Sequence, residues 1–448
     1  MTVLPAPTRS RGLRAALEAA RPQRVGVVSS VVGLGVEVTG LDCAIGDLVT
    51  IGHDASVVAE VIAASRTSLR CMPLNRLAGV RAGDPARAQG ADLLVPTGDA
   101  LFGRVIDGRG RPIDGKGPLG ADSRVPIGNE SPPAMDRARI DTPLQLGVRV
   151  LDTLTTVGRG QRMGLFAGSG VGKSSLLSMI ARGTDAEVSV IALVGERGRE
   201  VREFLEDDLG EEGLARSIVV VATSDEPAMM RLRAAFVATR IAESFRDRGA
   251  HVMLMMDSLT RVAMAQREIG LSVGEPPATR GYPPSTFSLL AQLLERAGTG
   301  STGSVTGIYT VLVDGDDHNE PIADAARSIL DGHVVLDRRL AVSGHFPSVD
   351  ALASISRVAS RVNPAEHTRL AGTLRTVLAA RKAAQDLLDI GAYQPGANPL
   401  VDAAVANERE INAFLQQSMT DQSTSADAWA QLSRLASSFG LASSTGVR

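Results

Sequence analysis

The chain has 448 residues, and its 47 Lys and Arg against 50 Asp and Glu give a formal net charge of −3. This length allows two or three domains, and 44% apolar with 22% charged residues is typical of a globular protein. The near-neutral balance gives no general attraction to nucleic acid or acidic membranes. No apolar run approaches the roughly 20 residues of a membrane span or forms a secretory leader. Cys43 and Cys71 lack the spacing of a metal site, so we expect a reduced, cytosolic protein.

The first 23 residues predict a helix with one apolar face. Leu13, Ala16, Leu17 and Ala20 follow the spacing of such a face, and the segment carries four arginines against a single acid. Two interpretations stay open. The segment is either a surface helix or a docking segment for a partner helix or an anionic membrane surface.

Beyond residues 1–23, the sequence predicts three domains. Residues 24–93 contain short apolar strands between Gly-rich or Asp-containing turns, which predicts a small β-barrel. Residues 98–118 are dense in Gly and Pro and are expected to form a loop. From residue 161, apolar strands alternate with helical stretches, the pattern of a parallel sheet covered on both faces, so 94–362 is assigned to an α/β domain. Residues 363–448 are predicted to be helical, with a Ser/Thr/Ala/Gly-rich tail.

The motif AGSGVGKS follows a predicted strand and precedes an apolar helix. Its glycines let backbone N–H groups surround a phosphate, and the helix N-terminus adds the positive end of its dipole. Lys173 is expected to reach the β- and γ-phosphates of ATP, and the Ser174 hydroxyl to bind Mg²⁺. Ala167 stands where this phosphate-binding pattern has Gly. The predicted nucleotide-binding positions are Ala167, Gly168, Ser169, Gly170, Val171, Gly172, Lys173, Ser174 and Ser175.

Two acidic residues stand at the ends of predicted parallel strands. The run HVMLMMD ends in Asp257, which is expected to hold Mg²⁺ beside the phosphate loop. The run VGERGRE carries Glu196 where a strand end points into the ligand crevice. Glu196 is a candidate for polarising the water that attacks the γ-phosphate. The alternative is a surface ion pair between Glu196 and Arg197 or Arg199.

Several long motifs resemble the catalytic subunits of rotary ATPases, and specifically the flagellar type III protein-export ATPases. The resemblance covers essentially the whole chain and lies in residues 103–118, 147–174, 278–298, 314–336 and 347–356. It implies an N-terminal β-barrel for oligomerisation, a central RecA-like P-loop ATPase domain and a C-terminal α-helical domain. It also implies Mg²⁺-dependent ATP hydrolysis in a homohexameric ring, with each site between neighbouring subunits.

The resemblance also assigns roles to single residues. Glu196 matches the family's catalytic glutamate, Arg197 its neighbouring arginine, and Arg261 the arginine that follows the strand ending in the magnesium-binding acid. Arg357 matches the finger inserted into the adjacent subunit's site, where such groups contribute roughly 10³–10⁵ in rate. Phe346 stands where the family places an aromatic ring against adenine. Identical subunits in a ring would complete one another's sites.

Several sequence features distinguish the flagellar export ATPases from related proteins. The regulatory subunits usually carry Gln at the position of Glu196, so we expect a catalytic chain. Residues 391–399 read GAYQPGANP and lack the acidic run of synthase subunits. This motif favours a flagellar over a virulence-type secretion ATPase, and a synthase catalytic subunit is less favoured still. A hexameric RNA helicase is rejected, because residues 24–90 contain no aromatic ring for base stacking. A non-enzymatic scaffold would require a dead site, yet every catalytic position checked is filled.

The partners are implied by the resemblance alone. They are a stator-like negative regulator at the N-terminus, a coiled-coil stalk at the C-terminal helices, export-gate membrane proteins and chaperone–substrate complexes, with no nucleic acid. The sequence EREI at residues 408–411 departs from the family's sequence pattern, which leaves the partner contacts of the C-terminal region open. The implied location is the cytoplasm, in peripheral association with the inner membrane at the export apparatus.

Overall fold

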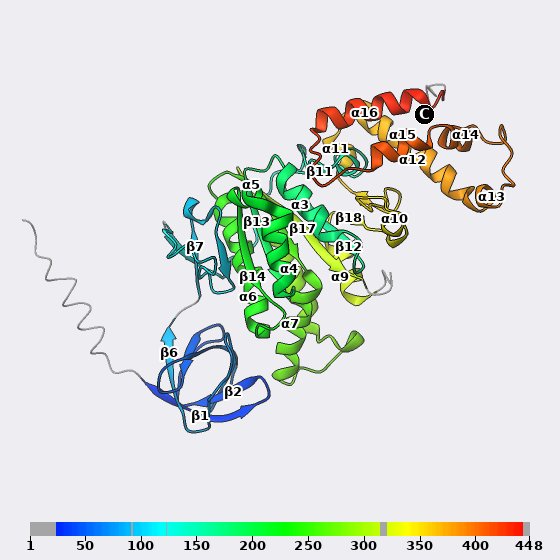
Figure 1. The fold of residues 1–448 in the computed structure, drawn as a ribbon. Coiled ribbons are helices and arrows are strands. Elements are labelled where there is room, and N and C mark those ends of the chain that lie inside the picture. The colour runs from blue at the N-terminus through cyan, green and yellow to red at the C-terminus, as the bar shows by residue number, and fades with distance from the viewer. Residues whose placement is uncertain (1–23, 91–92, 122, 314–319, 442–448) are drawn as a thin grey trace, which may run out of the picture. The chain divides into compact units, whose positions relative to one another are not determined.

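The computed structural model describes residues 24–90, 93–121, 123–313 and 320–441 (Figure 1). The chain divides between Leu93 and Leu94 into two compact units. The helix predicted in residues 1–23 lies outside the described residues. Within the described residues, no helix is both long enough and apolar enough to cross a membrane.

The N-terminal unit contains the predicted β-barrel, closed by six antiparallel strands in the order β1-β2-β5-β4-β3-β6. Its interior is filled by Val, Ile, Leu and Ala side chains together with Cys71. Most of these side chains are small or branched at the β-carbon, and branched ones pack well on a pleated surface, so the barrel closes without an aromatic ring. The oligomerisation role of residues 24–93 stays a prediction. The strands are β1 (Val25–Val32), β2 (Gly35–Thr39), β3 (Leu48–Ile51), β4 (Val57–Ala64), β5 (Leu69–Pro73) and β6 (Pro85–Gly90).

The second unit is built on a nine-stranded sheet with the order β19-β18-β12-β17-β15-β13-β14-β8, and β16 pairs with β17. All pairs from β18 to β8 are parallel. Every residue of β13 and β14 is buried, as expected for strands covered on both faces. The strands are β8 (Val105–Asp107), β12 (Arg162–Ala167), β13 (Val188–Val194), β14 (Ser217–Ala222), β15 (His251–Asp257), β16 (Gly298–Thr299), β17 (Ser304–Leu312), β18 (Gly332–Val335) and β19 (Ile355–Ser356). Short strands outside this sheet are β7 (Leu94–Thr97), β9 (Ser123–Pro126), β10 (Pro143–Leu144) and β11 (Val157–Gly158).

The prediction of a loop over residues 98–118 is wrong for β8. This strand pairs with β14 through Val105 and Val219, at one edge of the sheet. Three residues between glycines are too few to show a strand period, so tertiary pairing decides their conformation. A side chain at Gly108 would come within 2.6 Å of the Met230 carbonyl oxygen, so a glycine lets β8 lie close to α6.

Helices pack against the sheet: α6 against β13, β14 and β15, α7 against β17, and α9 against β12 and β17. In α6 the buried Ala234, Ala235 and Ala238 let the helix approach the strands closely. The helices of this region are α2 (Arg149–Leu154), α3 (Lys173–Gly183), α4 (Gly198–Glu203), α5 (Gly210–Ala215), α6 (Ala228–Arg246), α7 (Leu259–Ser272), α8 (Pro284–Glu295), α9 (Pro321–Ile329) and α10 (Arg338–Val342). The π-helix η2 (Phe204–Leu209) joins α4 to α5, and η1 (Asp99–Leu101) and η3 (Thr279–Gly281) are short 3₁₀ turns.

The predicted C-terminal helices are present (Figure 1). They dock on the rest of the second unit through α2, which contacts α12, α15 and α16. Arg149 of α2 is buried, donates to the Phe414 carbonyl oxygen at 3.2 Å and pairs with Asp421 at 2.7 Å. These bonds tie the end of α15 and the following loop to the region that contains the nine-stranded sheet. The helices are α11 (Ala359–Val362), α12 (Ala365–Ala383), α13 (Gln385–Asp389), α14 (Pro399–Ala406), α15 (Glu408–Leu415) and α16 (Ser425–Ser438).

A buried ion pair fixes α6 to the end of α8 and gives a test of this packing. Two Arg296 guanidinium nitrogens lie 2.7 Å from the two Glu243 carboxylate oxygens, and the Asn129 amide donates to the same carboxylate at 2.8 Å. Replacing Arg296 with Met removes both of its hydrogen bonds to the buried carboxylate and leaves only the looser contact with Arg240 at 3.5 Å, so we expect a loss of about 3–5 kcal/mol in unfolding free energy. Chemical denaturation measures it. The control Arg202→Met breaks an exposed pair with Glu206 and should change little; equal shifts would contradict the prediction.

Candidate active site

The loop predicted to bind phosphate joins the end of β12 to the start of α3. Gly170 and Gly172 have φ of +73° and +87°, a left-handed conformation that glycine adopts without strain. Gly172 immediately precedes Lys173, the first residue of α3, so the loop ends at a helix N-terminus. Ala167 is the last residue of β12 and pairs with Leu312. Its extended backbone has room for a methyl group, which explains why this position does not need Gly.

The loop lines a cavity of about 770 Å³ at the carboxyl ends of the strands. Six further segments complete this cavity: the residues that follow β13, the loop after β14, the start of α7, the turn before α8, the end of β17 and the residue before α9. Most of the predicted site residues therefore lie together, whereas Ala167, Val171, Asp257, Phe346 and Arg357 do not line it. The predicted residues that do are Gly168, Ser169, Gly170, Gly172, Lys173, Ser174, Ser175, Glu196, Arg197 and Arg261.

Lys173 connects the loop to both predicted acids. Its Nζ lies 2.6 Å from Asp257 Oδ1 and 3.2 Å from Glu196 Oε1. Burial alone would lower the pKa of Lys173, but the charges of Asp257 and Glu196 and their hydrogen bonds outweigh it and raise the pKa. The lysine is therefore a fixed cation at the place where the loop would hold phosphate.

Asp257 is held by a residue that the sequence analysis did not single out. The Thr310 hydroxyl, on β17 between β12 and β15, donates to Asp257 Oδ1 at 2.7 Å. A threonine near the end of a buried strand was the available signal, because a buried hydroxyl needs a partner. The Ser174 hydroxyl lines the cavity and has no hydrogen bond to any residue that the structure describes. A carboxylate and a hydroxyl are oxygen ligands of the kind that Mg²⁺ prefers, so these residues fit the ion.

Glu196 faces the cavity and does not form a surface ion pair. Burial raises its pKa, the negative charge of Asp257 raises it further, and Lys173 acts in the opposite direction. Arg197 pairs with Glu200, and Arg199 forms an ion pair with Glu203. Glu200 also hydrogen-bonds Glu196 and lines the same cavity, although the sequence analysis gave it no role.

Arg261 brings a second cationic group to the cavity. It follows Asp257 by one turn of α7 and lies over Gly195, where an added β-carbon would come within 2.8 Å of Arg261 Cβ. Its buried Nε has no hydrogen-bond partner. An unpaired buried donor costs free energy unless a ligand satisfies it, so this guanidinium is placed to receive an anion.

Phe346 and Arg357 occupy different places. Phe346 is 45% exposed, and its ring lies 3.4 Å from the position of a β-carbon added at Gly172, so it stands beside the loop. The next turn is fixed to the loop by Ser348, whose hydroxyl donates to the Val171 carbonyl oxygen at 2.6 Å. Arg357 follows β19 at the other edge strand of the sheet, is exposed, and does not reach the cavity of its own chain.

Family models match two parts of the chain. Residues 147–356 match the nucleotide-binding domain of the ATP synthase alpha/beta family. Residues 363–434 match the C-terminal domain of the type III secretion ATPase EscN. Together with the loop and cavity, these matches define a P-loop ATPase of the ATP synthase alpha/beta class, which binds nucleotide.

Individual relatives define the family more closely. The chain is 53% identical to the flagellum-specific ATP synthase of Bacillus subtilis (strain 168), over 88% of this chain and 91% of the relative. It is 48% identical to the type 3 secretion system ATPase of Xanthomonas euvesicatoria, over 89% and 91%. The structure of assembled EscN from enteropathogenic E. coli matches with a TM-score of 0.86 and 43% identity, covering 92% of this chain and 100% of that one. The chain belongs to the family of flagellum-specific ATP synthases and type 3 secretion system ATPases.

The contact between Thr310 and Asp257 leads to a prediction about magnesium. Thr310→Val removes the bond that orients the carboxylate while keeping the volume of the side chain. We expect the Mg²⁺ concentration for half-maximal ATPase activity to rise about tenfold, since a hydrogen bond to a charged group contributes this much. Thr310→Ser, which keeps the hydroxyl, is the matched control and should stay near the original value. An identical Mg²⁺ dependence for Val and Ser would remove Thr310 from this role.

Proposed function

We propose that the chain is the ATPase of a flagellar type III export apparatus and hydrolyses ATP with Mg²⁺. The observation that carries the proposal is the position of Lys173, at the start of the loop's helix and within 3.2 Å of both Asp257 and Glu196. The flagellar assignment draws on the flagellum-specific relatives and on the motif at residues 391–399. A virulence-type secretion ATPase is the second candidate, because relatives with that name are 47–49% identical.

The residues of the cavity divide the chemistry among them. The loop amides and Lys173 hold the β- and γ-phosphates. Asp257 and Ser174 hold Mg²⁺, which neutralises charge on the phosphates when bound. Glu196 accepts a proton from water while the water oxygen bonds to the γ-phosphorus. The bond between the γ-phosphorus and the bridging β-phosphate oxygen breaks, which gives ADP and phosphate. Arg261 faces the phosphates with its unpaired donor.

Two further arginines act nearer the rim of the site. Arg197 is largely exposed and is fixed by its pair with Glu200, so it stands at the entrance beside Glu196. Arg357 stabilises the γ-phosphoryl group in the site of a neighbouring copy, and Phe346 packs against the adenine. Because Arg357 does not reach its own cavity, identical subunits must complete one another's sites, which supports a homohexameric ring.

The proposed partners follow from the relatives. EscN is described both assembled and in complex with its central stalk EscO, and we extend a ring and a stalk contact at the C-terminal helices to this chain. A stator-like negative regulator at residues 1–23, export-gate membrane proteins and chaperone–substrate complexes complete the proposal. The chain would then work in the cytoplasm, peripherally associated with the inner membrane at the export apparatus.

The role of Glu196 is tested by Glu196→Gln. We expect unchanged binding of ATP with Mg²⁺ and a kcat lower by about 10²–10⁴-fold, the usual contribution of a general base. Because the pKa of Glu196 is raised, kcat of the unmodified protein should fall on the acid side with a midpoint above the ordinary value of 4.5. In the source bacterium the substitution should stop secretion of flagellar proteins. Near-normal turnover would remove Glu196 from the catalytic role, and loss of virulence effectors alone would favour the second candidate.

A mixing experiment tests the shared site. Arg357→Ala and Glu196→Gln chains should each be inactive alone. In a one-to-one mixture, one interface in four joins an intact Glu196 to an intact Arg357, so about a quarter of the unmodified activity should return if sites act independently. The control mixes Glu196→Gln with Lys173→Ala. Both residues come from the same chain at each site, and no chain in this mixture has both intact, so the mixture should stay inactive. Absence of recovery in the first mixture would place Arg357 outside the neighbouring site.

A further inference from the structure

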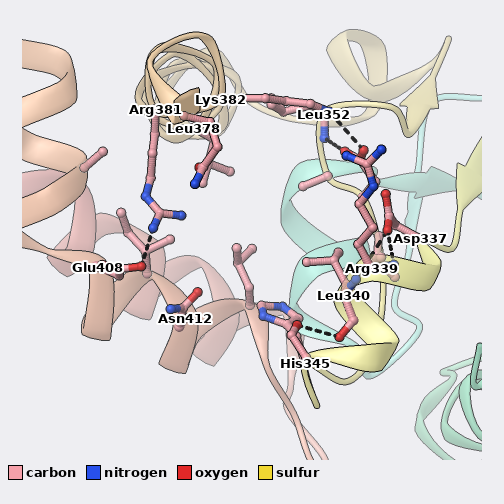
Figure 2. A pocket seen from close by; sticks show the side chains of 18 residues that line it. Asp337, Arg339, Leu340, His345, Leu352, Leu378, Arg381, Lys382, Glu408 and Asn412 are labelled. Atoms are coloured by element: carbon pink, nitrogen blue, oxygen red, sulfur yellow. Dashed lines mark hydrogen bonds and ion pairs between the residues drawn. The ribbon is translucent and has the colours of Figure 1, made fainter. Parts of the chain in front are cut away.

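A second cavity, of about 470 Å³, lies apart from the phosphate loop, between residues 337–352 and the C-terminal helices (Figure 2). One wall is formed by α10 and the segment that follows it, and the other by α12, α14 and α15. A cavity of this size holds a small molecule. None of the predicted site residues lines it.

The walls of this cavity, which we call the hinge pocket, are mostly apolar. Side chains from both walls face each other across it and would enclose a hydrophobic body of a ligand. Neither wall contributes a Phe, Tyr or Trp ring. The apolar residues used in this argument are Leu340, Val349, Leu352, Leu378, Ile411 and Leu415.

Most charged groups at the rim already have partners. Lys382 lies 3.3 Å from Asp350, and Arg381 pairs with Glu408 (Figure 2). The Asp337 carboxylate caps α10 by accepting the backbone N–H groups of its first turn. These acids are therefore engaged, and the cations beside them are neutralised.

Arg339 and Asn412 remain without side-chain partners among the residues that the structure describes. Arg339 stands on the α10 wall and Asn412 on the α15 wall (Figure 2). His345 adds no charge, because burial lowers its pKa. The α10 wall thus offers one guanidinium without an ion-pair partner, which suits an anionic group, and the α15 wall opposite offers one amide for a second polar group.

We propose that the hinge pocket binds a small amphipathic anion and that its occupation changes the affinity of the phosphate loop for nucleotide. The ligand has an apolar body for the walls, one carboxylate, sulfonate or phosphate for Arg339, and a polar group at its other end for Asn412. This second site goes beyond the ATPase function, and its binding step does not depend on it.

The coupling follows from the contacts of the wall formed by residues 337–352. On the face away from the hinge pocket, Ser348 holds the Val171 carbonyl oxygen at 2.6 Å, and Phe346 stands over Gly172. The Phe346 carbonyl oxygen also accepts the backbone N–H of Gln417 at 2.9 Å, and Gln417 belongs to the loop that follows α15. A ligand between the two walls therefore touches a segment whose position sets the shape of the phosphate loop.

Binding is tested with 8-anilinonaphthalene-1-sulfonate, an aromatic anion that fluoresces in apolar sites. We expect saturable binding to the full chain and an affinity lower by about tenfold in Arg339→Ala, the loss expected for a charged contact. Arg338→Ala is the matched control, since Arg338 is exposed, adjacent in sequence and not a lining residue. Asn412→Ala should weaken binding too. Equal affinity in Arg339→Ala, Asn412→Ala and Arg338→Ala would overturn the site.

Coupling is tested by calorimetric titration of a non-hydrolysable ATP analogue with and without the sulfonate. We expect the dissociation constant of the analogue to change about fivefold, the lower end of ordinary allosteric coupling, and not to change in Arg339→Ala at the same sulfonate concentration. Sulfonate binding without any change in nucleotide affinity would overturn the regulatory part. Failure of the analogue to bind even without sulfonate would instead contradict the ATPase assignment and leave the binding result standing.

Discussion

The contact of the Lys173 ammonium with Asp257 and Glu196 depends on three strands that end at the same edge of the sheet. Lys173 follows β12, Asp257 ends β15 and Glu196 follows β13, so the parallel order that places β17 between β12 and β15 is required. Three like-directed strands bring their carboxyl ends to one edge, where a buried cation is stable only beside carboxylates. The apolar sheet thereby fixes the charges of the site.

The same sheet separates two groups that we propose act in one reaction. Arg357 follows the edge strand β19, whereas Glu196 follows β13 near the other edge, with β18, β12, β17 and β15 between these two strands. A rigid sheet cannot bring the two side chains together within one chain. A ring of copies resolves this geometry, since the edge of one subunit then meets the carboxyl ends of the next. Strand order, and not an exposed apolar patch, is thus the reason to expect an oligomer.

Sequence alone predicted the parallel sheet, the barrel, the helical C-terminal region and the phosphate loop, because each has a local signature. Strand β8 was missed since three residues carry no period and β14 decides their pairing. Thr310 was missed because its role depends on β17 lying beside β15. Glu200 was missed because an acid in a charged helix is ordinarily exposed. Contacts between strands and cavity geometry depend on tertiary packing, which local patterns do not encode.

The segment between β18 and β19 contacts the phosphate loop and also lines the hinge pocket, and it is the route of the coupling that we propose. Ser348 and Phe346 contact the phosphate loop, while Leu340 and Val349 line the hinge pocket. Arg149 and Gln417 tie the loop after α15 to the same unit, because Gln417 Oε1 accepts the backbone N–H of Arg149 at 2.9 Å. Close-packed segments shift as units because their interiors have few voids. In the coupling that we propose, a displacement of the C-terminal helices would reach the phosphate loop through this segment, and nucleotide binding would act on the helices by the same route.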